Sequence, residues 1–209
     1  MTTPLGTLEV AAREGRRVTV ARRTHETDIA VTLDLDGTGA ADVRTGVGFL
    51  DHLLGSFAHH GLFDLAIRAT GDLEVDEHHT VEDVAIVLGA ALSESLGDRA
   101  GIVRFGEASV PMDEALATAV VDVGGRPYAV VDLPFRGERV GALPTQLVEH
   151  ALEAFARTSG TTLHLRGTGR NDHHLAEAAF KALARALRAA VAEDPRRAGA
   201  VPSTKGSLG

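Results

Sequence analysis

The chain has no cysteine among its 209 residues, and only 4% of them are aromatic. Without cysteine it can form no disulfide bond, offers no thiolate metal ligand and has no cysteine nucleophile. With so few aromatic rings, the core must be built mainly from Ala, Val, Leu and Ile.

The chain also lacks an apolar run long enough to span a membrane, and its first fifteen residues lack the apolar segment of a signal peptide. We therefore expect a cytoplasmic protein with no membrane partner. Positive charge is scarce as well: the formal net charge of −8 argues against non-specific nucleic-acid binding. A local basic pocket for a small anion is compatible with that balance.

What the sequence does contain is one pattern twice, His-His-x-x-Glu at 78–82 and at 173–177. On a helix, residues four apart lie about 40° apart around the axis, so His78 and Glu82 share a face. The adjacent His79 is rotated by about 100°, so such a pair serves two different ions more easily than one. Imidazole nitrogens and carboxylates are metal ligands, and two matching copies favour metal binding over solvated loop histidines.

The expected secondary structure repeats in the same order. Alternating and helical spacings predict strand, helix, strand and helix over 29–35, 49–57, 62–75 and 81–96. In the second half they predict a strand pair, a helix, a strand and a helix over 116–123 with 128–133, 147–156, 161–166 and 175–191. We therefore predict an α+β fold of duplicated strand-strand-helix-strand-helix halves, with sheets packed on helices.

The expected boundaries follow from this repeat. We expect a flexible N-terminal tail, two half-repeats and an irregular C-terminal segment, over 1–16, 17–100, 101–194 and 195–209 respectively.

Six histidines and two glutamates occupy matching places in the halves, because Leu50-Asp51-His52 corresponds to Val148-Glu149-His150. The candidate metal ligands are His52, His78, His79, Glu82, His150, His173, His174 and Glu177. They suffice for two ions, each with three His and one Glu, and a sulfur-free set suits Mn, Fe, Co, Ni or Zn. The pseudo-symmetry favours one ion on Glu82, His78, His174 and either His52 or His150, and another on Glu177, His173, His79 and the remaining histidine. Whether one chain or two supply these ligands stays open.

Four further residues are candidates for binding a phosphate or carboxylate: Arg104, Arg126, Ser203 and Lys205. Arginine offers a fork of donors to oxyanions, and lysine a compact charge. Nearby glycines, such as Gly124-Gly125, permit close backbone approach. Spacing alone does not separate these residues from ordinary solvated cations.

Seven stretches together resemble the imidazoleglycerol-phosphate dehydratase family, over a length from about residue 17 to the C-terminus. They are 23–27 (RTHET), 46–54 (GVGFLDHLL), 60–64 (HGLFD), 76–83 (DEHHTVED), 124–128 (GGRPY), 169–174 (GRNDHH) and 202–206 (PSTKG). The resemblance implies a carbon–oxygen lyase of histidine biosynthesis that removes water from D-erythro-imidazole glycerol phosphate and gives imidazole acetol phosphate. It also implies a ribosomal protein S5 domain 2-like fold.

The resemblance further implies a site and an assembly. The eight ligands above would hold two manganese ions per active site, with catalytic roles for Glu26, His78, His79, Glu82, His173 and His174. Substrate and phosphate contacts would come from Glu26, Arg104, Arg126, Lys181, Ser203 and Lys205, with residues 195–209 closing the phosphate site. The family implies a homo-oligomer of 24 subunits with active sites at subunit interfaces. One departure is Gly55-Ser56, where the family usually has Asp-Gln; no metal ligand is missing, so we expect activity to survive.

Two metals suit this elimination because the proton to be lost lies on a carbon with no neighbouring carbonyl. A metal on each ring nitrogen would hold the imidazole as imidazolate, and hydroxide would leave through a diazafulvene-like intermediate. Glu26 is the candidate for proton transfer. Two alternatives remain: a non-catalytic protein whose metals only join subunits, and a dinuclear hydrolase, which would usually carry more than two carboxylates.

Overall fold

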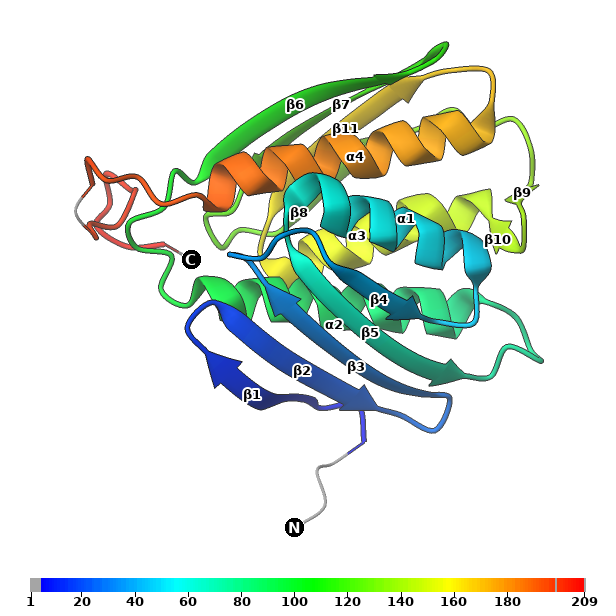
Figure 1. Cartoon of the computed structure of the whole chain (residues 1–209), viewed down its shortest axis with the longest axis horizontal. Helices are drawn as coiled ribbons and strands as arrows, with labels where there is room; N and C mark the ends of the chain where they lie inside the picture. The colour runs from blue at the N-terminus through cyan, green and yellow to red at the C-terminus, as the bar shows by residue number, and fades with distance from the viewer. Residues whose placement is uncertain (1–4, 198, 209) are drawn as a thin grey trace.

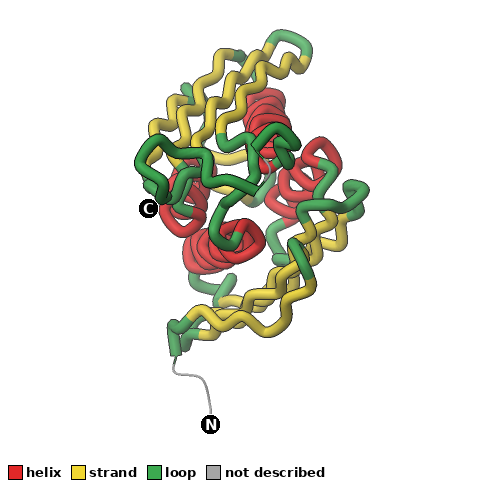
Figure 2. Tube along the Cα trace, turned by 90° about the vertical axis from the view of Figure 1, so that its left-hand side faces the viewer, coloured by secondary structure: helices red, strands yellow, loops and turns green. Residues whose placement is uncertain are grey.

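The structure is a computed structural model that describes residues 5–197 and 199–208. Within this part of the chain, two large sheets form the outer layers and four helices lie between them (Figures 1 and 2). None of the helices described there is both long and apolar enough to cross a membrane.

The first half builds a sheet with two helices on its inner face. Its strands are β1 (Leu8–Glu14), β2 (Arg17–Arg23), β3 (Thr27–Asp34), β4 (Ala41–Arg44) and β5 (Asp64–Gly71). Its helices are α1 (Gly48–Gly61) and α2 (His78–Leu96). The strand order is β1-β2-β3-β5-β4, and β4 runs parallel to β5 because α1 connects them. Ile29, Val31 and Leu33 of β3 are buried, as the alternating pattern predicts.

The second half repeats this arrangement. Its strands are β6 (Phe105–Met112), β7 (Ala115–Asp122), β8 (Tyr128–Asp132) and β11 (Thr162–Thr168), with a small ribbon of β9 (Arg139–Val140) and β10 (Leu143–Pro144). Its helices are α3 (Thr145–Ser159) and α4 (Asp172–Val191). The strand order β6-β7-β11-β8 matches β2-β3-β5-β4 position by position. The predicted duplication of the fold is therefore confirmed.

Two expectations need correction. The strands at 116–123 and 128–133 do not pair with each other: β11 lies between β7 and β8, because α3 carries the chain over to a position parallel to β8. The expected N-terminal tail contains β1, which pairs with β2 and covers its otherwise open edge. All of β1 is exposed, so its sequence carries no burial pattern that would reveal it. Residues 1–4 of that tail, and residues 198 and 209, lie outside the described residues.

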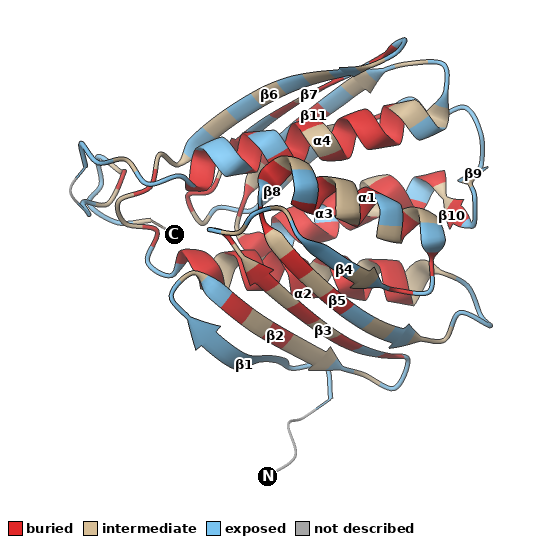
Figure 3. Cartoon of the chain, in the orientation of Figure 1, coloured by how far each residue is buried: buried red, intermediate tan, exposed pale blue. Residues whose placement is uncertain are grey.

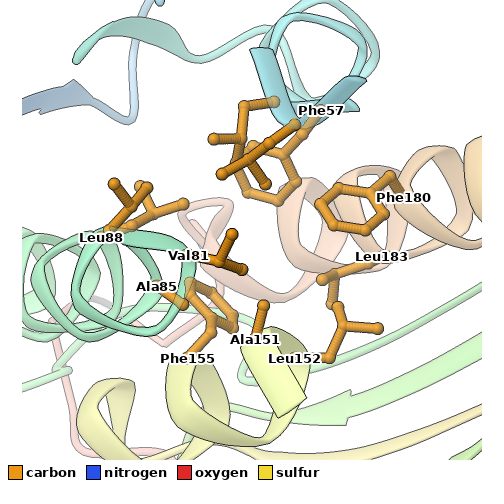
Figure 4. A pocket seen from close by; sticks show the side chains of 12 residues that line it. Phe57, Val81, Ala85, Leu88, Ala151, Leu152, Phe155, Phe180 and Leu183 are labelled. Carbon is orange, nitrogen blue, oxygen red and sulfur yellow. The ribbon is translucent and has the colours of Figure 1, made fainter. Parts of the chain in front are cut away.

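The core lies where the two halves meet helix to helix, with α1 packed on α4 and α2 on α3, and Figure 3 shows buried residues on these helices. Ala, Val, Leu and Ile supply most of the buried residues, as the composition predicts. Phenylalanines nevertheless occupy the centre: Phe57, Phe155 and Phe180 line a small apolar cavity of about 30 Å³ between the helices (Figure 4). The apolar lining of this cavity offers a water molecule no hydrogen-bond partner.

Candidate metal centres

Both His-His pairs lie at the first turn of a helix. The side chain of Asn171 caps α4 by accepting from the N–H groups of His173 and His174, at 3.0 and 3.4 Å. At α2, Oδ1 of Asp76 accepts from the N–H of His78 at 2.8 Å. Each helix therefore begins with a backbone hydrogen bond to a polar side chain at the place where the paired histidines stand.

The first cluster, which we call the α2–α3 cluster, consists of His78, Glu82 and His150. One ligand atom from each lies within 4.8 Å of the others. Nε2 of His150 is 3.2 Å from Oε1 of Glu82, and Nε2 of His78 is 3.9 Å from Oε2. His78 and Glu82 share a face of α2, as the four-residue spacing predicts.

The second cluster, the α1–α4 cluster, consists of His52, His173 and Glu177 within the same limit of 4.8 Å. Nε2 of His52 lies 2.7 Å from Oε1 of Glu177, and Nζ of Lys181 donates to Oε2 at 3.2 Å. Glu177 is only 7% exposed. Burial alone would raise the pKa of Glu177, but the hydrogen bonds from Lys181 and His52 outweigh it and hold the pKa below its usual value.

Both clusters fit a divalent cation. Nε2 of His150 is buried and makes no hydrogen bond in the described residues, although it faces Glu82. A buried ring nitrogen without a hydrogen-bond partner is costly unless something else binds it, and a metal ion would satisfy it. Each cluster offers two imidazoles and one carboxylate, which leaves positions open for further ligands.

The structure also settles which members of the repeated motif lie together in one chain. His150 lies with His78 and Glu82, and His52 lies with the second motif. His174 does not join the first set, nor His79 the second, among the described residues. Within a single chain, each expected set of four ligands is therefore a set of three. The second histidine of each His-His pair, His79 or His174, belongs to neither set.

The two leftover histidines are each held by a carboxylate. Nδ1 of His79 lies 3.0 Å from Oδ2 of Asp72, and Nδ1 of His174 lies 2.9 Å from Oε2 of Glu114. The hydrogen bond with Asp72 raises the pKa of His79, and the hydrogen bond from His174 lowers the pKa of Glu114 to about 2. A carboxylate on Nδ1 orients the ring and leaves Nε2 for a metal, a recurring arrangement in metalloproteins.

Glu26 lies beside the first of these histidines. It occupies the turn between β2 and β3, and its Oε1 is 3.8 Å from Nε2 of His79. The Glu26 side chain is 53% exposed, so a substrate could reach it.

Two of the predicted phosphate residues, Arg104 and Arg126, lie at the carboxylate of Asp122. Nε and Nη2 of Arg104 donate to this carboxylate at 2.7 and 2.9 Å, and Nη2 of Arg126 lies 3.9 Å from it. Nη1 of Arg104 donates to the carbonyl of Pro202 at 2.7 Å, which brings Ser203 of the C-terminal segment to the same place. The pKa of Arg104 is raised by its hydrogen bonds to Asp122. Arg126 remains 69% exposed and keeps most of its donors available.

This group lies far from the metal clusters of its own chain. The N–H of Arg104 donates to the carbonyl of Ala190 near the end of α4, 17 residues after His173 at its start. At about 1.5 Å per residue, that separation is about 26 Å along the helix. Figure 1 shows the C-terminal segment at the opposite end of α4 from its first turn. Lys181 lies on α4 between His173 and Ala190, and its ammonium group donates to Glu177.

Sequence reasoning missed Asp72, Glu114 and Asp122. Asp72 directly follows β5 and Glu114 lies in the β6–β7 turn, so the two carboxylates occupy different places in the repeat. A search for residues repeated between the halves cannot find them. Asp122 has a weak signal, since it ends β7 four residues before Arg126.

The fold and the two clusters define an α+β protein of two repeated halves with paired histidine–glutamate sites suited to divalent metals. A sequence profile of imidazoleglycerol-phosphate dehydratase matches residues 45–187, more than half of the chain. The chain belongs to the imidazoleglycerol-phosphate dehydratase family, and it is accordingly a carbon–oxygen lyase of histidine biosynthesis.

Individual relatives agree with this assignment. The chain is 60% identical to imidazoleglycerol-phosphate dehydratase from Methanoculleus marisnigri over 189 residues, which are 90% of this chain and 97% of that protein. It is 55% identical to that of Dinoroseobacter shibae, over 92% of this chain and 100% of the relative. The crystal structure of the Pyrococcus furiosus enzyme matches with a TM-score of 0.78 and 39% identity, over 90% of this chain and 99% of that one. The Staphylococcus aureus enzyme matches with a TM-score of 0.74 and 39% identity, over 80% and 95%.

Proposed function

We propose that the chain removes water from imidazole glycerol phosphate, to give imidazole acetol phosphate, in metal-dependent active sites assembled from more than one copy of itself. Family membership supports the reaction. The observation that carries the shared site is the length of α4 between the α1–α4 cluster and the Arg104 group. About 26 Å of helix separates His173 from Ala190, which accepts from the N–H of Arg104, and a small substrate cannot span it.

The clusters would bind the imidazole ring of the substrate. Two Mn²⁺ ions held there would supply Lewis-acid stabilisation of the ring as its anion. The α2–α3 and α1–α4 clusters supply three ligands each. His79 and His174, whose rings are held with Nε2 available, complete the clusters of neighbouring subunits.

The residues of the chain itself would handle the proton and the phosphate. The Glu26 carboxylate takes the proton from the substrate carbon, since it is accessible and lies beside His79. Arg126, Ser203 and Lys205 of a neighbouring subunit bind the phosphate, and the Arg104 guanidinium, held by Asp122, anchors the C-terminal segment there. Lys181, which donates to Glu177, would contact the substrate from the α1–α4 side.

Such an arrangement requires closed self-association, and we propose the 24-subunit assembly that the resemblance implies. A heterologous contact, in which one face of a subunit meets a different face of the next, brings the far end of α4 to a neighbour's metal clusters.

Subunit mixing tests both parts of the proposal. His78→Ala removes a metal ligand and Arg126→Ala removes a phosphate donor, so each variant alone should be inactive. If the two residues come from different chains, random reassembly after metal removal and return should restore roughly one quarter (one half times one half) of the wild-type ketone production. A mixture of His78→Ala with Glu82→Ala is the matched control, because every chain then lacks the same cluster and no activity should return.

Two results would contradict the proposal. A wild-type protein loaded with Mn²⁺ that forms no ketone product would favour the assembly role without catalysis. A mixture of the His78 and Arg126 variants that stays inactive, although it reassembles, would show that each chain uses both residues in one site of its own.

A further inference from the structure

Helix α2 presents a second functional face beside its metal ligands. His79 and Asp83 are four residues apart and therefore point to the same side, toward the turn between β2 and β3. Asp83 is 6% exposed. One of its oxygens accepts from the hydroxyl of Thr27, and the other is paired with the guanidinium of Arg22. We call these three residues the Asp83 anchor.

The anchor is continuous with the backbone of the turn that carries Glu26. Because the Thr27 hydroxyl gives its proton to Asp83, it accepts from the hydroxyl of Thr24 at 3.1 Å. The Thr24 oxygen in turn accepts from the N–H groups of Glu26 and Thr27, at 3.0 and 2.9 Å. A chain of hydrogen bonds therefore runs from α2 to the backbone of Glu26.

The second half of the chain lacks every polar group of this anchor. Thr27 and Ala115 are the first residues of the matching strands β3 and β7. Asp83 and Ala178 each lie five residues after the first histidine of the repeated motif. The equivalence of Arg22 and Val110 follows from strand pairing. Arg22 pairs with Ile29 and Val110 pairs with Ala117, and Ile29 and Ala117 are the third residues of β3 and β7. Arg22, Thr27 and Asp83 thus correspond to Val110, Ala115 and Ala178.

The carboxylate in the turn before the matching strands β3 and β7, Glu26 or Glu114, also has a different role in each half. Glu114, the equivalent of Glu26, holds Nδ1 of His174 at 2.9 Å. In the first half Asp72 holds Nδ1 of His79 at 3.0 Å instead. Glu26 is thereby released from the orienting role and lies on the Nε2 side of the ring. Only the half with a released carboxylate has the anchor.

We propose that Arg22, Thr27 and Asp83 are positioning residues that hold the Glu26 carboxylate for proton transfer. This inference rests on the proposed function. The repeated fold itself does not require the anchor, because the second half forms the same strands and helix with Val110, Ala115 and Ala178 at the equivalent places.

The second half also supplies the test variant. In Arg22→Val/Thr27→Ala/Asp83→Ala the anchor takes the residues of the apolar counterpart, so the fold, thermal unfolding and manganese content should be close to wild type. The turn should loosen, which predicts faster amide hydrogen exchange in a peptide covering 24–28. A misplacement of about 1 Å can cost about 100-fold in rate, so we expect kcat to fall by about that factor with KM within about two-fold.

A double-mutant cycle separates positioning from general damage. In a Glu26→Gln background the triple substitution should lower residual kcat no further, because the group it positions is already gone. Equal losses in both backgrounds would overturn the inference, and so would a triple variant with wild-type kcat. If the triple variant fails to fold, Asp83→Asn keeps the shape and one oxygen; a fall in kcat that vanishes in the Glu26→Gln background supports the inference, and an unchanged kcat overturns it.

The hydrogen-exchange measurement remains informative if the wild-type protein proves inactive. That result would end the proposed function. Unchanged exchange at 24–28 in the triple variant would then separately overturn the anchoring, and faster exchange confined to that peptide would support it.

Discussion

The pairing of Lys181 with the buried Glu177 gives a sharp prediction about stability with and without metal. Nζ of Lys181 donates to a carboxylate that is almost fully buried. In Lys181→Met the stem still packs, but the carboxylate loses its nearest cation. Breaking a buried pair typically costs 3–5 kcal/mol; because His52 still hydrogen-bonds Glu177, we expect about 2 kcal/mol for the metal-free protein.

A bound cation changes this expectation. A divalent ion in the α1–α4 cluster would supply the positive charge that the lysine provides in its absence. The destabilisation should therefore shrink to well below 1 kcal/mol in saturating Mn²⁺. At roughly 2–4 °C per kcal/mol for a chain of this length, the metal-free variant should melt about 4–8 °C below the wild type, and the loaded variant within about 2 °C of it.

Differential scanning calorimetry of both proteins, with chelator and with Mn²⁺, measures this difference. Arg185→Met is the matched control, since Arg185 is exposed one turn further along α4 and should shift neither midpoint. The pH dependence of the stability difference between wild type and Lys181→Met gives a further test. The pKa of Glu177 is depressed, so its favourable contribution is present above its ordinary value of 4.5 and is lost as pH falls through the folded value; the difference between wild type and variant should fade in acid. An equal loss with and without metal would refute the reasoning.

Three further predictions concern separate parts of the molecule. His150→Ala should lower bound manganese by about half, measured by elemental analysis, because the α1–α4 cluster stays intact; loss of all metal would show that the clusters are not independent. Phe155→Ala should destabilise the chain by about 4 kcal/mol in urea titration, because it enlarges the existing apolar cavity, and a loss below about 1 kcal/mol would contradict that packing. Asp64→Asn should cost about 1 kcal/mol at pH 7, because Asp64 accepts from the N–H of Thr38 and its neighbours. Those bonds lower the pKa of Asp64, so its contribution is present above the ordinary value of 3.8 and is lost as pH falls through the folded value; a cost that persists at pH 2 would contradict the assignment.

The periodicity of apolar residues was sufficient to predict the repeated halves, because a strand or helix buried on one face has apolar residues at regular spacing. Periodicity failed for β1, because this strand is exposed throughout and has no such spacing, and because its pairing depends on the open edge of β2. It also failed for β7 and β8, because strand order depends on the path of α3 rather than on the strands' own residues. The two repeated halves could thus be predicted from the sequence, but the order in which strands pair within each sheet could not.

The candidate site divides in the same way. Spacing four residues apart places His78 with Glu82, and His173 with Glu177. The choice between His52 and His150 required the packing of α1 on α4 and of α2 on α3, which no local pattern contains. Glu26 entered through a family resemblance alone.

The length of α4 has a consequence for how this protein behaves in a cell. On the proposed function, a solitary chain in dilute solution has nowhere to hold both ends of its substrate, so specific activity should fall on dilution below the assembly threshold. Two alleles, one damaged at the first turn of α4 and the other near its last, would each fail to support growth without histidine, yet a cell carrying both would grow.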